Sequence, residues 1–226
     1  MKHTIRLAAA ALIVMVPWTA ARSFPIGVSA RAGIGVSYYS MTELDDHFAV
    51  VARDFDMIMP ELSKGVNVML QGRVWFFDFI AISGGFAHFW GESKLDIGEV
   101  SPITYKAPAN VYTIGGAVRA FSVTDVLDVN LGINGCFAKS TFGTNLLTPR
   151  RLSEYKGNDW GFELIAEAAS NFLYPVEIGV QMGYRRLTVD HFEDKFGDTA
   201  LFPESTTEIK LDYGGPFLFL TAGIRL

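Results

Sequence analysis

The sequence predicts an all-β protein, an eight-stranded, antiparallel, up-and-down transmembrane β-barrel with long extracellular loops and short periplasmic turns. Three observations lead to this prediction. Eight segments alternate between apolar residues and small or polar ones with a period of two. The intervals between the starts of these segments are alternately long and short. Finally, 50% of the residues are hydrophobic, yet no stretch offers the ~18 consecutive apolar residues of a transmembrane helix.

Residues 1–22 have the features of a cleaved signal peptide. Lys2 and Arg6 are basic, an apolar run follows at 7–16, and small residues stand at 19–21. The apolar run is shorter than the ~20 residues of a membrane-spanning helix, which disfavours the alternative of an uncleaved anchor. We therefore expect an exported protein with one mature domain at 23–226.

Composition narrows the class of protein further. The mean hydropathy is +0.24, which is apolar for an exported chain. A closed barrel can place such a chain in lipid because it pairs every backbone N–H and C=O group. Cys136 is the only cysteine and cannot form an internal disulfide. The net charge of −5 becomes −7 without Lys2 and Arg6, which argues against a nucleic-acid partner.

The first mature segment, 26–39, alternates without interruption and is long enough to cross a bilayer at a tilt. Residues 40–65 break this pattern. Thr42 and Asp45 resemble a capping box, and apolar residues then recur at helical spacing, so we expect a loop with about four helical turns that ends at Pro60. This loop is rich in acidic residues.

Alternation resumes in two segments at 66–76 and 80–90, joined by a tight connection at 77–79. A loop containing glycine and proline follows, then two more strands at 110–121 and 126–138 with a short turn between them.

A polar loop at 139–160 precedes the last three expected strands, 161–172, 176–185 and 213–226. The acidic loop 188–212 lies before the final one. The strand starts, near 26, 66, 80, 110, 126, 161, 176 and 213, therefore give long and short intervals in strict turn. Membrane barrels show this asymmetry because one rim carries long loops and the other short turns.

The identity of the residues on each face favours a membrane barrel over a soluble one. An eight-stranded barrel is only just wide enough to be filled by its side chains, so large residues at every inward position would overpack it. We therefore expect the small and charged face to line the lumen and the large apolar face to contact lipid.

Aromatic residues gather near the strand ends, as in interfacial girdles. These aromatic residues are Tyr38, Tyr39, Phe76, Trp90, Phe137, Trp160, Phe172, Tyr174 and Tyr213. The expected lumen-lining residues are Arg31, Arg73, Arg119, Asp128, Asn130, Glu163, Glu167, Glu177, Gln181, Arg185 and Arg225. The expected lipid-facing residues are Ile34, Val74, Ile82, Val118, Leu131, Leu164, Val180 and Leu220.

The terminal strand ends in Gly223-Ile224-Arg225-Leu226 and has an apolar face formed by Leu218, Leu220, Ile224 and Leu226. With this strand and the overall architecture, the mature chain resembles the small eight-stranded outer-membrane proteins, the families of outer membrane proteins W and X and the transmembrane domain of outer membrane protein A. The resemblance implies an integral outer-membrane location, extracellular loops, periplasmic termini, and an assembly signal recognised by the barrel assembly machinery at the four apolar residues above. Leu226 departs from the Phe or Trp that usually ends this signal.

The inward charges are nearly balanced, which allows two interpretations: a paired network that plugs the lumen, or a solute path lined by these groups. We expect a porin-like protein that passes small solutes through a narrow, gated lumen. The alternative is a surface anchor whose loops 40–65 and 188–212 bind a host or matrix ligand. The loop residues Asp45-Asp46-His47 and Asp190-His191 resemble the Asp/His pairs of omptin-type proteases only weakly. The clustered carboxylates of these loops suit the binding of Ca²⁺, and the alternative is that they are simply solvated surface charges. We expect no enzyme activity, metal or cofactor.

Overall fold

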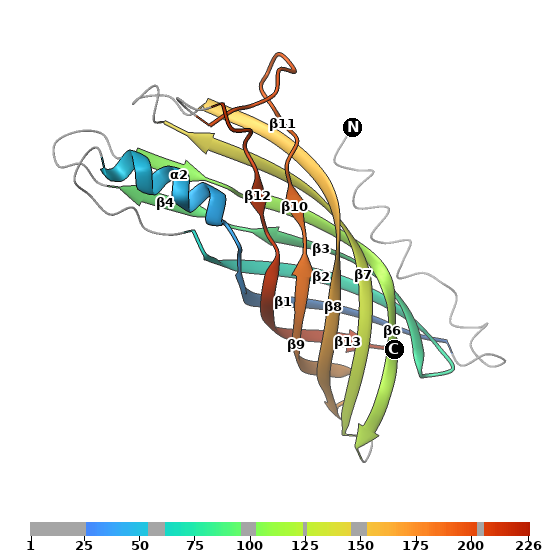
Figure 1. Ribbon diagram of the computed structural model, residues 1–226. Helices are drawn as coiled ribbons and strands as arrows, with labels where there is room; N and C mark the ends of the chain where they lie inside the picture. Colours follow the sequence, from blue (N-terminus) through green and yellow to red (C-terminus); the bar gives the residue numbers. More distant parts are fainter. Residues whose placement is uncertain (1–25, 54–61, 96–102, 124–125, 146–152, 203–205) are drawn as a thin grey trace, which may run out of the picture.

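A computed structural model describes residues 26–53, 62–95, 103–123, 126–145, 153–202 and 206–226; the predicted signal peptide and Pro60 lie outside them. Each barrel strand is antiparallel to both neighbours, and the last strand pairs with the first, so the ring is closed (Figure 1). The predicted eight-stranded fold is thereby confirmed. In ring order the strands are β1 (Ile26–Tyr38), β2 (Lys64–Phe76), β3 (Ile80–Phe89), β6 (Ala109–Val123), β7 (Leu127–Thr144), β8 (Ser153–Leu173), β9 (Val176–Arg186) and β13 (Gly215–Arg225).

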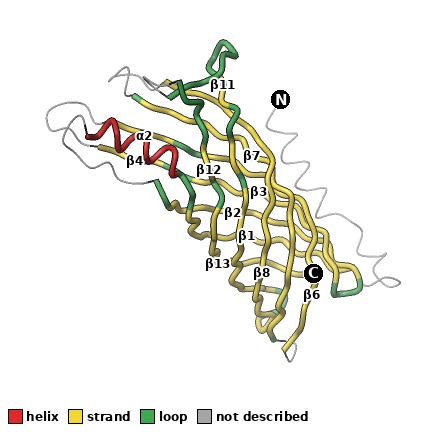
Figure 2. Tube along the Cα trace, in the orientation of Figure 1, coloured by secondary structure: helices red, strands yellow, loops and turns green. Residues whose placement is uncertain are grey.

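The smaller elements gather at one end of the barrel, which we call the loop side (Figure 2). The opposite end, the turn side, holds the connections at 77–79 and 174–175, the end of β6 and the start of β7, and the residues Ile26 and Leu226. On the loop side β5 pairs with β7, β11 pairs with β8, and β10 pairs with β12. These elements are α2 (Thr42–Arg53), β4 (Glu92–Leu95), β5 (Ile103–Lys106), β10 (Thr188–Val189), β11 (Phe192–Glu193) and β12 (Leu211–Asp212).

Among the described residues, no helix is both long and apolar enough to cross a membrane.

Local chemistry explains where several of these elements end. Phe77 and Asp78 have φ angles of 53° and 61°, the left-handed pair that closes a tight hairpin between β2 and β3. Gly215 begins β13 with φ 146°, and a Cβ there would lie 2.0 Å from the carbonyl oxygen of Tyr38. Only glycine fits this close approach, which brings β13 against β1 and so closes the barrel.

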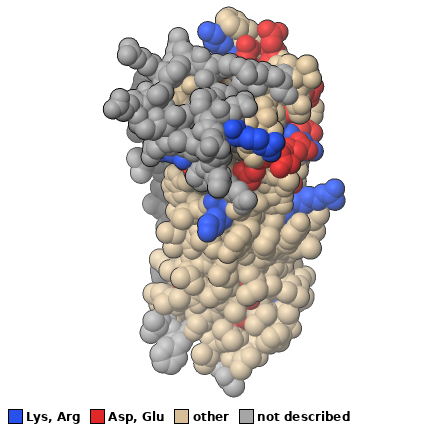
Figure 3. All heavy atoms as spheres, turned by 60° about the vertical axis from the view of Figure 1, so that its left-hand side comes forward, with Lys and Arg blue, Asp and Glu red and all other residues tan. Residues whose placement is uncertain are grey.

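The outer wall of the barrel is apolar. Ile34, Leu131 and Leu220 are each about half exposed, at 58%, 48% and 63%. In Figure 3 the lower part of the visible face is almost free of charge, and blue and red side chains gather in the upper part, toward the loop side. Such a belt is the surface that a barrel presents to lipid.

Some expected boundaries were wrong. β7 runs to Thr144 and β8 starts at Ser153, so most of the expected loop 139–160 is strand. The pairing of these strands continues to Thr144↔Ser153, beyond the apolar belt, where solvated faces no longer alternate between apolar and polar residues. The loops between β3 and β6 and between β9 and β13 also contain short strands that alternation did not reveal. The expected helix is present as Thr42–Arg53, and the rest of the expected segment up to Pro60 lies outside the described residues.

The expectation of an interior made of small and charged residues holds for only half of the barrel. Tyr39 and Tyr213, expected in an interfacial girdle, are 6% and 1% exposed and pack inside the loop side. Phe89, Phe217 and Phe219 are buried with them. Large aromatic side chains fill this half of the interior because the loops fold over it and supply a second apolar surface.

Candidate functional site

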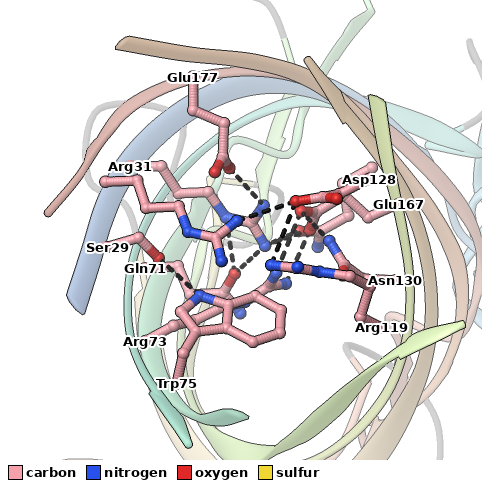
Figure 4. Close-up of polar contacts among 12 residues, drawn as sticks. Ser29, Arg31, Gln71, Arg73, Trp75, Arg119, Asp128, Asn130, Glu167 and Glu177 are labelled. Atoms are coloured by element: carbon pink, nitrogen blue, oxygen red, sulfur yellow. Dashed lines mark hydrogen bonds and ion pairs between the residues drawn. The ribbon is translucent and has the colours of Figure 1, made fainter. Parts of the chain in front are cut away.

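The lumen holds a network of charged and amide side chains centred on Glu167 (Figure 4). Arg73 binds its carboxylate with both terminal nitrogens, Nη1 to Oε1 at 3.0 Å and Nη2 to Oε2 at 2.7 Å. Arg31 forms an ion pair with the same carboxylate. Asn130 donates to Glu167 Oε1 at 3.2 Å, and Arg31 Nε donates to Gln71 Oε1 at 2.9 Å. We call these five residues the central network.

Strand register explains why these residues meet. Asn130 pairs directly with Glu167, and Glu167 pairs with Gln181 on the next strand. On the opposite wall Arg31 pairs with Gln71. Directly paired residues point to the same face of a sheet, so each set points inward, and the narrow barrel brings the two walls together.

The central network is buried and its charges are close to balanced. The side chains of Arg31, Arg73 and Glu167 are only 2%, 3% and 1% exposed. A second carboxylate, that of Glu177, lies 3.8 Å from Arg31 Nη1, so two guanidinium groups face two carboxylates. Buried charges are tolerated only when they are paired in this way, because desolvation of an unpaired ion costs several kcal/mol.

A second group of charges closes the turn side of the lumen. Asp128 Oδ2 accepts from Arg225 Nη1 at 2.8 Å and lies 3.2 Å from Arg119 Nη2. The Trp75 ring lies beside these cations, with its centroid 5.4 Å from the Arg119 guanidinium carbon and 5.2 Å from that of Arg225. Trp75 is 3% exposed and donates to Ser29 Oγ at 3.3 Å. The aromatic ring therefore stacks among cations across the lumen.

A third group links the charged lumen to the apolar loop side. Arg185 donates to Glu163 Oε2 from Nη2 at 2.9 Å and from Nε at 3.2 Å, and Asn134 donates to Glu163 Oε1 at 2.8 Å. The Arg185 guanidinium also lies 4.5 Å from the Phe89 ring centroid and 4.9 Å from that of Phe217. Above this level the interior is mainly apolar, with a few buried polar groups such as Asn67 and Ser140.

The loops form a cap over the loop side, defined here as α2 together with residues 187–202 and 206–214. Its buried apolar residues belong to the same cluster as Phe89 and Phe217; Leu44, Phe202 and Leu211 are 0%, 2% and 0% exposed. The Tyr213 hydroxyl donates to the Ala107 carbonyl at 3.0 Å and lies 2.5 Å from Ser140 Oγ. Burial raises the pKa of the Tyr213 phenol.

Two further contacts join the parts of the cap to one another. The ring of His47 stacks on that of Phe202 at 4.6 Å, and burial lowers the pKa of His47. Lys210 Nζ lies 3.3 Å from Glu43 Oε1. The two loops singled out in the sequence, 40–65 and 188–212, are thus one packed unit in their described parts.

The residues predicted from the sequence to line the lumen or to contact lipid lie on opposite faces of the barrel wall. All of the expected lumen residues point inward, and the charged ones form the three groups above. All of the expected lipid-facing residues point outward, with Val180 half-buried and the others exposed. The expected assembly-signal residues Leu218, Leu220 and Ile224 lie on the outer face of β13, and Leu226 is 71% exposed at the turn-side rim.

The two Asp/His pairs have structural contacts. Asp45 Oδ1 accepts from the backbone N–H of Leu62 at 3.0 Å and so fixes the chain leaving the helix loop. Asp190 and His191 lie with Asp159 at the rim, with ligand atoms within 4.8 Å of one another. Asp159 is distant in sequence, so this trio could not be recognised before the strands were paired. The His191 side chain is 81% exposed, and its Nδ1 lies 2.5 Å from Asp190 Oδ1, a contact accessible to solvent.

No protein-family model and no curated protein sequence matches the chain. The similarity is structural. Ail from Yersinia pestis, solved in complex with the heparin analogue sucrose octasulfate, aligns with a TM-score of 0.51 and 12% identity over 89% of this chain and 99% of that one. OprG from Pseudomonas aeruginosa gives 0.52 and 10% identity over 88% and 95%. A major outer membrane protein from Thermus thermophilus gives 0.52 and 12% over 89% and 99%.

Sequence identities this low are evidence for a shared fold and for nothing further. The apolar belt is an independent observation, and a closed barrel with such a belt is an integral membrane protein. The chain therefore has the eight-stranded fold of small outer-membrane β-barrel proteins.

Proposed function

We propose that this protein is an outer-membrane anchor that presents its cap to a partner outside the cell, with its loops extracellular and its termini periplasmic. The observation that supports the proposal is the filling of the lumen. Charged groups cross it at the turn side and at mid-height, and the apolar cluster under the cap fills the loop side. A barrel packed in this way holds the cap rigidly at the membrane surface.

Porin-like passage of small solutes is the second candidate. It is favoured by the charged lumen, since charged and polar groups also line aqueous channels. Passage would require the Glu167 carboxylate to separate from Arg31 and Arg73, and the apolar cluster above to part as well. Each separation exposes groups that stabilise one another when paired, so a closed barrel is the interpretation that the contacts favour.

The charge of the cap indicates the chemistry of its partner. Loop 40–65 contains more acidic than basic residues, and loop 188–212 does as well. A surface of this sign attracts cations and repels polyanions. The cap therefore suits a basic protein segment, in contrast to the sulfated ligand with which Ail was solved. Within the cap the acidic residues are Glu43, Asp45, Asp46, Asp190, Glu193, Asp194, Asp198, Glu208 and Asp212, against Arg53, Lys195 and Lys210.

Planar-bilayer recording tests the closed lumen. We expect no steady conductance from the folded wild-type protein, and none from Glu167→Gln or Arg119→Gln beyond transient events. Steady wild-type channels whose conductance or selectivity changes in these two variants would establish the porin-like function instead.

Binding to proteoliposomes tests the cap. Polylysine of defined length should be retained by wild-type proteoliposomes and released by salt, and sucrose octasulfate should not be retained. Asp46→Asn with Glu208→Gln, both exposed cap positions, should weaken retention, whereas Glu154→Gln at the tip of β8 serves as a control outside the cap. Equal retention by all three proteins would refute a role for the acidic cap.

A further inference from the structure

The outward faces of the barrel strands carry their positive charges at one rim. All three of Lys64 on β2, Lys139 on β7 and Arg186 on β9 are exposed; Lys64 and Arg186 are the loop-side terminal residues of their strands, and Lys139 lies in the loop-side part of β7, five residues before Thr144. The outward residues at the turn-side ends are apolar, as Ile26, Ile80 and others show. The barrel is therefore asymmetric in charge along its axis, with a basic ring on the loop side. We call these three residues the basic collar.

The collar coincides with the aromatic boundary of the apolar belt. Lys64 pairs directly with Tyr38, which is 55% exposed. Lys139 Nζ lies 5.9 Å from the Phe137 ring centroid, and Phe137 packs on Trp160 at 4.8 Å. Exposed aromatic residues of this kind mark the level of the lipid headgroups. A lysine beside them extends its alkyl stem along the belt and its ammonium group toward the headgroups.

The collar cations have no acidic partner in the described part of the chain. Among the residues that the structure describes, no carboxylate forms an ion pair with Lys64, Lys139 or Arg186. The neighbours of Lys139 in the sheet are the neutral Asn110 and Asn158. Other basic residues near this end do have acidic neighbours: Lys94 and Lys106 lie 3.0 and 3.6 Å from Glu92, and Lys156 pairs in register with Glu193. These three residues are therefore left out of the collar.

The spacing around the ring decides which partner fits. In ring order two strands lie between β2 and β7, one lies between β7 and β9, and two lie between β9 and β2, so the cations face outward in different directions around the barrel. A protein or a soluble ligand could touch one side only. The leaflet that surrounds the barrel touches every side at this height.

We propose that the basic collar binds anionic, phosphate-bearing headgroups of the lipids in the loop-side leaflet, and that this contact sets the height of the barrel in the membrane. Guanidinium and ammonium groups form strong, charge-assisted hydrogen bonds to phosphate oxygens. The inference requires an inserted barrel but does not depend on what the cap binds. The acidic cap then faces a cationic partner outside the cell, and the basic collar faces anionic headgroups in the membrane.

Native mass spectrometry of the detergent-folded protein tests this proposal, with phosphatidylcholine or bisphosphorylated lipid A titrated in. The wild-type protein should retain lipid A at lower concentration than phosphatidylcholine. Lys139→Gln with Arg186→Gln should weaken lipid A binding roughly 30-fold, at roughly fivefold for each cation. The matched control, Lys195→Gln with Lys210→Gln, removes two cap cations and should bind as the wild type does.

Three results would overturn the inference. The first is equal retention of the two lipids by the wild-type protein. This result does not depend on whether any variant folds. The second is an equal loss in the collar and cap variants. The third is displacement of lipid A by the same concentration of inorganic phosphate, which would make the collar a site for free anions instead of for a lipid surface.

Discussion

Replacement of Glu167 by Gln tests the central network most directly. The change keeps the size of the side chain and removes the charge that Arg31 and Arg73 share. Both guanidinium groups are nearly inaccessible to water, so the loss leaves two buried like charges with Glu177 as the remaining carboxylate, 3.8 Å from Arg31. Breaking a buried pair costs about 3–5 kcal/mol, and we expect about 3 kcal/mol because Glu177 offsets part of the loss.

Urea unfolding in lipid vesicles, followed by tryptophan fluorescence, measures this change. Glu154→Gln is the matched control, because it is the same substitution at an exposed position on the same strand and should change the free energy of unfolding by less than about 0.5 kcal/mol. Arg73→Gln combined with Glu167→Gln should cost less than the sum of the single changes. A loss below about 1 kcal/mol for Glu167→Gln would refute the view that this carboxylate holds the lumen together.

Three further predictions concern the loop side and the closure of the barrel. Tyr213→Phe removes hydrogen bonds to Ala107 and Ser140 and should lower the free energy of unfolding by about 1–2 kcal/mol in the same urea assay. Because burial raises the pKa of Tyr213, the folded state favours the neutral phenol; stability is complete below the ordinary tyrosine pKa of about 10 and should fall as pH rises toward the higher folded-state pKa. Burial also raises the pKa of Tyr39 and Tyr105, so ultraviolet absorbance against pH should show several late-titrating tyrosines and Tyr213→Phe should lower the late amplitude by one tyrosine; an unchanged late amplitude in that variant would contradict the assignment. Gly215→Ala places a Cβ against the Tyr38 carbonyl at a φ of 146° and should abolish the heat-dependent shift in gel mobility of a folded barrel, whereas unchanged mobility would show that the backbone there can move.

The sequence alone was sufficient for the barrel. Alternation of apolar with small or polar residues is a local property, so it predicts where a strand lies and which face each residue occupies, as Ile34 and Arg31 show on β1. The alternating intervals between strands predicted the long loops at one rim. Alternation predicts nothing past the belt, where both faces of a strand meet water or the cap, and this is why the ends of β7 and β8 and the short strands of the loops could not be predicted.

Only the tertiary structure decided which inward residues meet and what fills the loop side. Glu167 and Arg73 are 94 residues apart, and their contact depends on the stagger between strands around the closed ring. Balanced inward charge predicted pairing but could not choose the partners. Tyr39 and Tyr213 likewise have the sequence pattern of interfacial aromatics, yet they point inward because the cap covers the barrel and offers them an apolar surface away from both lipid and water. The covering of the barrel mouth by its loops is a long-range event, and no local pattern in the chain records it.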